Sequence, residues 1–149
     1  MAEYETEIDI EAPPDVVFRH LTESDLMVTW MGQHAVLEPQ AGGRFEVNCN
    51  GVPLRGSFVA VEAPTRVVFS WGVAGNDELP AGSTQVEVTL EPTSAGTHLR
   101  LVHSNLPESE APKHDEGWSH FLPRLATAAA GRDPGPDPWA TAMPTATEG

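Results

Sequence analysis

The hydrophobic pattern of this chain changes its period once, and this change constrains the fold more than any other feature. Between residues 34 and 106, apolar and polar side chains alternate in short segments that are separated by turn residues. Such period-two segments, with turns every ~8–12 residues, are typical of an antiparallel sheet. After residue 113 the period becomes helical, and one stripe contains His114, Trp118, Phe121, Leu122 and Leu125. The pattern therefore predicts a sheet whose apolar face is covered by one amphipathic helix.

The first thirty residues add a strand and two short helices to this plan. Residues 4–11 alternate strictly with acidic residues, which predicts a strand with one solvent-facing side. Ala-Pro-Pro-Asp at residues 12–15 ends this strand and suits the first turn of a helix. A second helical turn is expected near residues 24–30. The order predicts an α+β fold, in which a curved antiparallel sheet wraps around a long C-terminal helix and leaves a cavity where the two do not close fully.

Three segments do not follow the pattern simply. The apolar register of residues 52–62 is unclear around Gly56, so the inward face of that strand stays open. Pro123 lies inside the helical stripe, and proline removes one helical hydrogen bond and crowds the carbonyl of Ser119, so we expect a kink or a break there. Residues 132–149 have several prolines and no periodicity, which predicts a disordered tail with Trp139 as its only large apolar residue.

Length and charge limit the class of protein. The 149 residues are expected to form one domain over residues 1–131, followed by the tail over residues 132–149. Eight basic residues against 22 acidic ones give a formal net charge of −14, which disfavours nucleic acid and anionic membrane surfaces as partners. The start of the chain is acidic, without the apolar run of a signal peptide, and no stretch approaches the ~18–20 apolar residues of a membrane span. We therefore expect an acidic cytoplasmic protein.

The sequence contains no motif for a metal, a cofactor or a catalytic triad. His114 and His120 are six residues apart, about 240° around a helix, so they do not share a face. There is no His-Glu-x-x-His, Cys-x-x-Cys or Gly-x-Ser-x-Gly pattern. The single cysteine, Cys49, excludes an internal disulfide, and its place among inward residues predicts a buried, inert thiol. We therefore predict no metal and no cofactor.

Four segments, in this order, resemble the SRPBCC superfamily, which has the START-like or helix-grip fold, and specifically its branch of activator of heat shock protein 90 ATPase homologues. They are residues 8–18 around Ala12-Pro13-Pro14, the Trp30-Met31 pair, residues 64–72 ending in Trp71-Gly72, and residues 96–104 followed by His114 and Gly117-Trp118. The resemblance covers roughly residues 3–130 and implies the fold already predicted. The chain departs from the pattern at Met31, where a second Trp is common, and at Pro123.

The resemblance implies three functions that the sequence leaves open. Similar proteins include ligand binders, cyclases and hydrolases of polyketide-like compounds, and co-chaperone domains. The leading hypothesis is binding of a small hydrophobic molecule in the cavity between sheet and helix. The alternative is co-chaperone-like stimulation of a heat shock protein 90 homologue, and the third is a cyclase or hydrolase that uses His103 as its base. Binding is favoured over catalysis, and a homodimer is a further possibility that no residue specifies.

The candidate ligand-binding residues are aromatic side chains and two histidines. The apolar contacts are assigned to Trp30, Phe45, Phe69, Trp71, Trp118 and Phe121. The alternative for each of these residues is that it fills the core. His103 shares strand parity with inward residues, so it is a ligand contact, a base or a satisfied core residue. His114 begins the helical stripe and either orients a polar group, kept neutral by the helix N-terminus, or belongs to a loop or cap.

Overall fold

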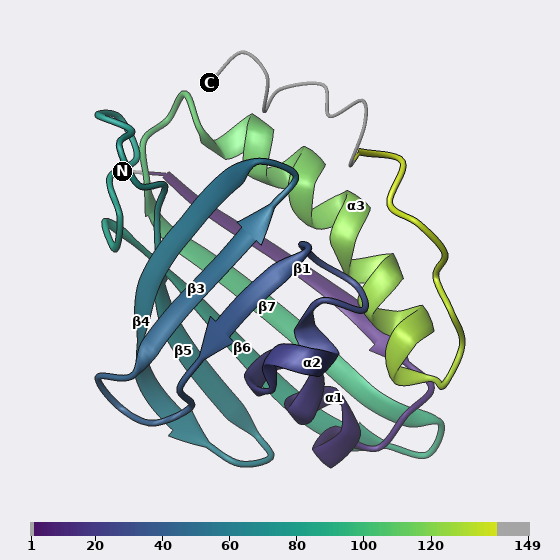
Figure 1. Cartoon of the computed structure of the whole chain (residues 1–149). Coiled ribbons are helices and arrows are strands. Elements are labelled where there is room, and N and C mark those ends of the chain that lie inside the picture. Colours follow the sequence, from purple (N-terminus) through teal and green to yellow (C-terminus); the bar gives the residue numbers. More distant parts are fainter. Residues whose placement is uncertain (1, 140–149) are drawn as a thin grey trace.

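The computed structural model describes residues 2–139 and shows a seven-stranded antiparallel sheet that curves around one long helix (Figure 1). The strand order across the sheet is β1-β7-β6-β5-β4-β3-β2. The elements are β1 (Ala2–Ile10), α1 (Pro14–Thr22), α2 (Ser24–Met27), β2 (His34–Leu37), β3 (Arg44–Cys49), β4 (Val52–Glu62), β5 (Arg66–Trp71), β6 (Thr84–Thr93), β7 (Gly96–Leu106) and α3 (Ala111–Ala129). The predicted α+β helix-grip fold, with two short helices after the first strand, is confirmed.

The core lies between the inner face of the sheet and α3. Val86, Val88 and Leu90 of β6 are at most 2% exposed, and their polar neighbours along the strand face outward. On α3, the stripe that contains Trp118, Phe121, Leu122 and Leu125 is buried against this face. Complete burial of such a side chain stabilises the fold by about 1.5–3 kcal/mol. The change of period in the sequence therefore marks the two surfaces that meet in the core.

Gly56 explains the unclear register of β4. A Cβ atom at this position would lie 1.9 Å from the backbone oxygen of Ser70 on β5, so only glycine fits. The pairing of β4 with β5 then shifts between Phe58 and Ala60, which places Phe58 in the core and leaves Val59 exposed. The inward face of β4 is set by this close approach of two backbones, which a pattern of apolar residues does not record.

The helix α3 begins earlier than expected and does not break. Its first residue is Ala111, whereas the apolar stripe starts only at His114. The first turn carries polar and proline residues, which suit a helix start but do not continue the apolar stripe. The helix is continuous through Pro123, so of the two outcomes expected there the break does not occur, and the kink remains a prediction. Pro123 is exposed, and its carbonyl accepts a hydrogen bond of 3.0 Å from Thr127 Oγ1. No helix within residues 2–139 has the length and apolar character required to cross a bilayer.

Residues 132–139, which we expected in a disordered tail, instead lie against α3. The guanidinium of Arg124 donates to the backbone oxygens of Pro134 (3.4 Å) and Gly135 (3.0 Å), and also to that of Trp30 (3.1 Å). The ring of Trp139 stacks on His120 with centroids 3.8 Å apart and planes 3° apart. These contacts come from side chains of the helix that lie far from the segment in the sequence, so a proline-rich composition gives no signal for them. The rest of the predicted tail, residues 140–149, lies outside the described residues.

Candidate ligand-binding site

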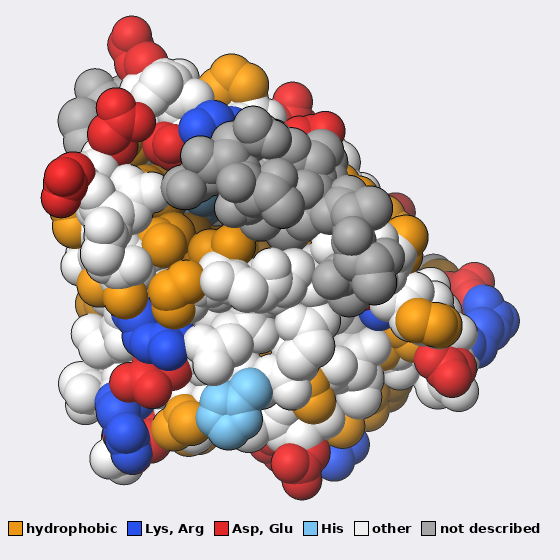
Figure 2. Space-filling view, turned by 45° about the horizontal axis from the view of Figure 1, so that its top comes forward, with side chains coloured by type: hydrophobic (Ala, Val, Ile, Leu, Met, Phe, Trp, Pro, Cys, Tyr) orange, Lys and Arg blue, Asp and Glu red, His pale blue; other side chains and the backbone are white. Residues whose placement is uncertain are grey.

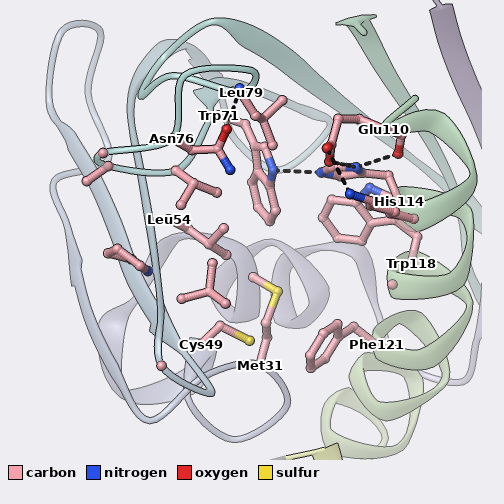
Figure 3. A pocket seen from close by; sticks show the side chains of 18 residues that line it. Met31, Cys49, Leu54, Trp71, Asn76, Leu79, Glu110, His114, Trp118 and Phe121 are labelled. Atoms are coloured by element: carbon pink, nitrogen blue, oxygen red, sulfur yellow. Dashed lines mark hydrogen bonds and ion pairs between the residues drawn. The ribbon is translucent and has the colours of Figure 1, made fainter. Parts of the chain in front are cut away.

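A cavity of about 390 Å³ lies between α3 and the curled part of the sheet (Figure 3). Its walls come from α3, from the β3–β4 turn, from the end of β5 and from the loop of residues 72–83. Most of its lining is apolar and includes Met31, Val52, Leu54, Val73, Leu79 and Phe121. Small-molecule sites are typically concave and apolar with a few polar groups, and their volumes are roughly 300–1,000 Å³. The cavity is thus large enough for a small ring system.

Half of the predicted ligand-binding residues line this cavity. They are Trp71 at the end of β5, and His114, Trp118 and Phe121 on α3. The three helical residues follow one another at the spacing of one face, so the amphipathic pattern brought them together correctly. Whether they contact a ligand remains a prediction.

Trp30, Phe45 and Phe69 do not line the cavity, and the structure places them in the packed core. Phe45 and Phe69 stack with centroids 4.1 Å apart and planes 11° apart. Trp30 is 1% exposed, and its indole N–H donates to the backbone oxygen of His20 at 3.0 Å. Strand parity predicts the side of the sheet that a residue faces, but it does not predict where along the curved sheet the cavity opens.

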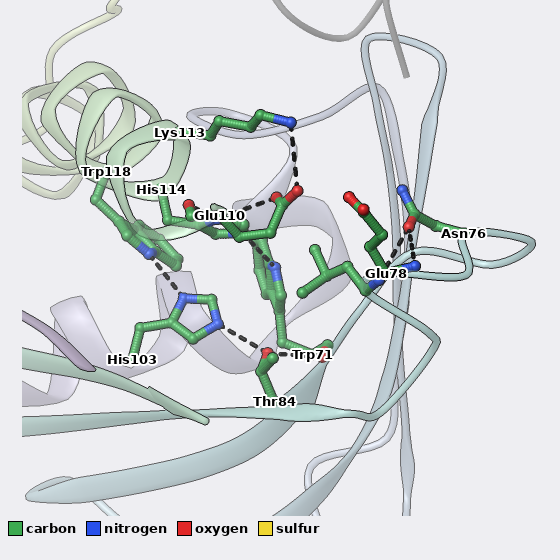
Figure 4. Close-up of polar contacts among 10 residues, drawn as sticks. Trp71, Asn76, Glu78, Thr84, His103, Glu110, Lys113, His114 and Trp118 are labelled. Carbon is green, nitrogen blue, oxygen red and sulfur yellow. Dashed lines mark hydrogen bonds and ion pairs between the residues drawn. The ribbon is translucent and has the colours of Figure 1, made fainter. Parts of the chain in front are cut away.

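His103 lies behind the cavity wall and is completely buried (Figure 4). Its Nδ1 accepts a hydrogen bond of 3.1 Å from the indole N–H of Trp118. Its Nε2, 2.8 Å from Thr84 Oγ1, therefore carries the proton, and Thr84 donates onward to the backbone oxygen of Trp71 at 2.7 Å. Burial, and then the proximity of His114, lower the pKa of His103 to about 3. A neutral ring with both nitrogens bonded is a satisfied core residue and has no free nitrogen to act as a base.

His114 is also held by the protein, at the edge of the cavity. Its Nε2 accepts from the indole N–H of Trp71 at 3.2 Å, so its Nδ1 donates to the backbone oxygen of Glu110 at 2.9 Å. Burial lowers the pKa of His114, and its contacts with Glu110 oppose this only partly. The ring is therefore neutral, as expected, but mainly because it is buried. His114 orients Trp71 and closes one end of the cavity.

The sequence analysis missed Glu110, Lys113 and Asn76, which give the cavity its polar end. Glu110 is the N-cap residue of α3, and its side chain is only 9% exposed. One carboxylate oxygen, Oε2, lies 3.3 Å from the ammonium of Lys113. A buried carboxylate at a helix N-terminus is favoured by the helix dipole. The helix start at Ala111 would be the signal for Glu110, but the helical periodicity of the sequence begins only at His114.

Neither a reactive thiol nor a metal site adds to the chemistry of the cavity among the described residues. Cys49 lines the cavity, and burial raises the pKa of its thiol to about 12, so the thiol is protonated at neutral pH. Within residues 2–139, no three His, Cys, Asp or Glu side chains are placed to hold a metal ion together. The chemistry that the site offers is therefore apolar contact, indole rings, the carboxylate of Glu110, the ammonium of Lys113 and the amide of Asn76.

A curved antiparallel sheet that grips a C-terminal helix, with a cavity between the two, defines the helix-grip class of the SRPBCC superfamily. A family model described as activator of Hsp90 ATPase homolog 1-like protein matches residues 11–130. The chain belongs to this AHSA1 family, as the resemblance predicted. A search of curated proteins found no match.

Solved structures agree with this assignment. An AHSA1-like protein from Rhizobium etli is 44% identical, with a TM-score of 0.74 over 93% of this chain and 88% of that one. DynU16, a protein in the dynemicin biosynthetic locus, is 25% identical, with a TM-score of 0.74 over 88% of this chain and 48% of that one. The Aha1 dimer from Colwellia psychrerythraea has a TM-score of 0.75 over 87% of this chain and 97% of that one, and at 24% identity it supports the fold alone.

Proposed function

We propose that this protein binds a small hydrophobic molecule in the cavity between its sheet and α3. The observation that carries the proposal is the cavity itself, which has a volume of about 390 Å³ and a mostly apolar lining. Concave, mostly apolar pockets of this size are typical of sites that bind small molecules. Apolar surface that a ligand buries here would contribute roughly 25 cal/mol per Å² before the costs of association are subtracted.

Gly117 allows a sharp test, because it lines the cavity from α3 and a Cβ there would meet no atom within 4 Å. Gly117→Leu should fill the cavity without backbone strain, and it should stabilise the helix, since glycine costs about 1 kcal/mol inside a helix. We expect wild-type protein to bind the uncharged fluorescent probe N-phenyl-1-naphthylamine, and Gly117→Leu to lose this binding. Ser119→Leu, at an exposed position of α3, is the matched control and should bind like wild type.

Native mass spectrometry of the purified protein adds an independent measurement. A bound mass that leaves on denaturation, and that is absent from Gly117→Leu, would support the proposal and indicate the ligand class. If the probe binds wild type and Gly117→Leu equally well, the cavity is not its site. If neither protein binds it, the proposal is wrong.

A second candidate function, stimulation of a heat shock protein 90 homologue, is favoured by the family description alone. Addition of saturating protein to such a chaperone should then increase its rate of ATP hydrolysis, and an unchanged rate would exclude this role. The third candidate, a hydrolase or cyclase with His103 as base, is disfavoured because both ring nitrogens of His103 are already bonded.

A further inference from the structure

The polar groups of the cavity are Glu110, Lys113 and His114, where α3 begins, and Asn76 in the loop of residues 72–83, and they differ in how fully they are bonded. His114 uses both ring nitrogens within the protein. The carboxylate of Glu110 has one oxygen, Oε2, beside Lys113 at 3.3 Å. The other oxygen, Oε1, lies 3.8 Å from His114 Nδ1, which donates instead to the backbone oxygen of Glu110. Among the described residues no hydrogen bond reaches Oε1, so Glu110, which lines this largely apolar cavity, has an acceptor with spare capacity.

Lys113 does not change this end of the cavity into an anion site. Its side chain is 52% exposed, against 9% for Glu110, so the ammonium contacts the carboxylate from the solvent side (Figure 4). Glu110 is the N-cap residue of α3 and makes no side-chain hydrogen bond to the helix backbone, but its negative charge already lies at the helix N-terminus, where an anionic ligand would otherwise be attracted. Acidic side chains are also spread around the outline of the molecule in Figure 2, in keeping with the net charge of −14. A ligand with a carboxylate would therefore be repelled at long range by the net negative charge of the protein and at contact by the carboxylate of Glu110.

From this arrangement we infer that the ligand is an uncharged ring-sized molecule with a hydrogen-bond donor, such as a hydroxyl, at the end that meets Glu110. Its apolar body lies between Trp71, Trp118 and the apolar side chains of the opposite wall, and its donor bonds to Oε1. Fatty acids and other carboxylates are excluded by the same oxygen. This inference rests on the proposed function, because it assigns the chemical class of ligand to the proposed cavity.

Three naphthalenes of nearly equal size test the inference by displacement of N-phenyl-1-naphthylamine from wild-type protein. 2-Naphthol offers a donor, 2-methoxynaphthalene offers none, and 2-naphthoate carries a negative charge at neutral pH. We expect 2-naphthol to bind about tenfold or more tightly than 2-methoxynaphthalene, since a hydrogen bond to a charged group is among the stronger kinds. 2-Naphthoate should bind most weakly of the three.

The variant Glu110→Gln then assigns the preference to one carboxylate. It keeps the shape and removes the charge, so the preference for 2-naphthol should fall to about threefold or less, and 2-naphthoate should gain affinity. Glu108→Gln, an equal change of charge at an exposed residue, should leave the order of the three compounds unchanged. The inference is overturned if 2-naphthoate binds most tightly, if all three compounds bind equally, or if none of them displaces the probe. Binding of the probe itself would still support the cavity as a ligand site in each of these cases. The ranking on wild type decides the matter even if Glu110→Gln does not fold.

Discussion

At the scale of single residues, His103 shows how a polar side chain can belong to the core. The ring connects three elements, because it accepts from Trp118 on α3, donates to Thr84 on β6, and is itself part of β7. Buried polar groups that are fully bonded specify one arrangement of the core, and removal of one member leaves the others without partners. The sequence left His103 open as a ligand contact, a base or a satisfied core residue, and in the structure it acts as a connection between sheet and helix.

His103→Ala should destabilise the fold strongly. The substitution removes a completely buried ring and leaves the indole N–H of Trp118 without its acceptor, so we expect the free energy of unfolding to fall by about 3–5 kcal/mol. His34→Ala, at an exposed histidine of β2, should change it by about 0.5 kcal/mol or less. Urea unfolding of the two variants and of wild type measures the difference. A stable His103→Ala protein would contradict the structural role.

His103 should also make the fold sensitive to acid. Its pKa is about 3 in the folded protein and near the ordinary value of 6.5 in the unfolded chain. The unfolded state therefore binds more protons between these values, so the contribution is fully present above pH 6.5 and is lost as the pH falls toward 3. As the pH falls over this interval, the free energy of unfolding should decrease more for wild type than for His103→Gln. The difference between the two decreases should reach up to about 5 kcal/mol. Parallel urea titrations at several pH values measure this, and equal slopes would refute it.

His98, on the outer face of the sheet, should show the opposite dependence on pH. Its Nδ1 lies 2.7 Å from Asp9 and its Nε2 lies 2.6 Å from Glu7, and these hydrogen bonds to β1 raise the pKa of His98. Its stabilising effect is fully present below the unfolded value of 6.5 and is lost as the pH rises through the raised value. His98→Gln should thus be less stable than wild type near pH 5.5, with a smaller difference near pH 9. A difference that does not depend on pH would argue against the charged pair.

At the scale of elements, residues 132–139 join α3 to the sheet across the side where the cavity lies. Asp137 accepts hydrogen bonds from His120 Nε2 on α3 at 2.7 Å and from Asn50 Nδ2 at 3.3 Å, beside the β3–β4 turn. Burial alone would raise the pKa of Asp137, but hydrogen bonds from the Trp139 backbone, His120 and Asn50 lower it overall. Gly51 and Phe121, next to these contacts, line the cavity. The segment therefore contacts two walls of the cavity and connects them.

Trp139→Ala should weaken this connection. The ring stacks on His120 and meets the edge of Phe121 with centroids 5.9 Å apart, so its loss should reduce the free energy of unfolding by about 1–3 kcal/mol. Trp139→Phe keeps a stacking ring and should recover much of this loss. Urea unfolding gives the energies, and the NMR shifts of the His120 ring report the stacking directly. Unchanged stability together with unchanged His120 shifts would show that the contact does not form in solution.

At the scale of the whole molecule, the periodicity of the sequence predicted the layers but not the position of the cavity. The α3 stripe placed Trp118 and Phe121 correctly, because one helical face meets one sheet face. Phe45 and Phe69 share that sheet face yet lie in the packed core, since the curvature of the sheet decides where the layers separate. Glu110 could not be found from its neighbours, because its role depends on the exact start of α3 and on the burial that follows.

Net charge acts on the whole molecule, and it leads to a prediction about salt. Surface pairs such as Arg100–Glu5 (2.6 Å) and Arg66–Glu87 (2.7 Å) stabilise the fold a little and are weakened by salt. Against them, 22 acidic side chains and only eight basic ones repel one another in the compact state. Because repulsion dominates, the free energy of unfolding should increase from low salt to about 0.15 M, where the Debye length is about 8 Å. Urea midpoints at neutral pH measure this, with sodium chloride and potassium chloride compared as a control for specific ion binding. A midpoint that falls with both salts would mean that the surface pairs outweigh the repulsion.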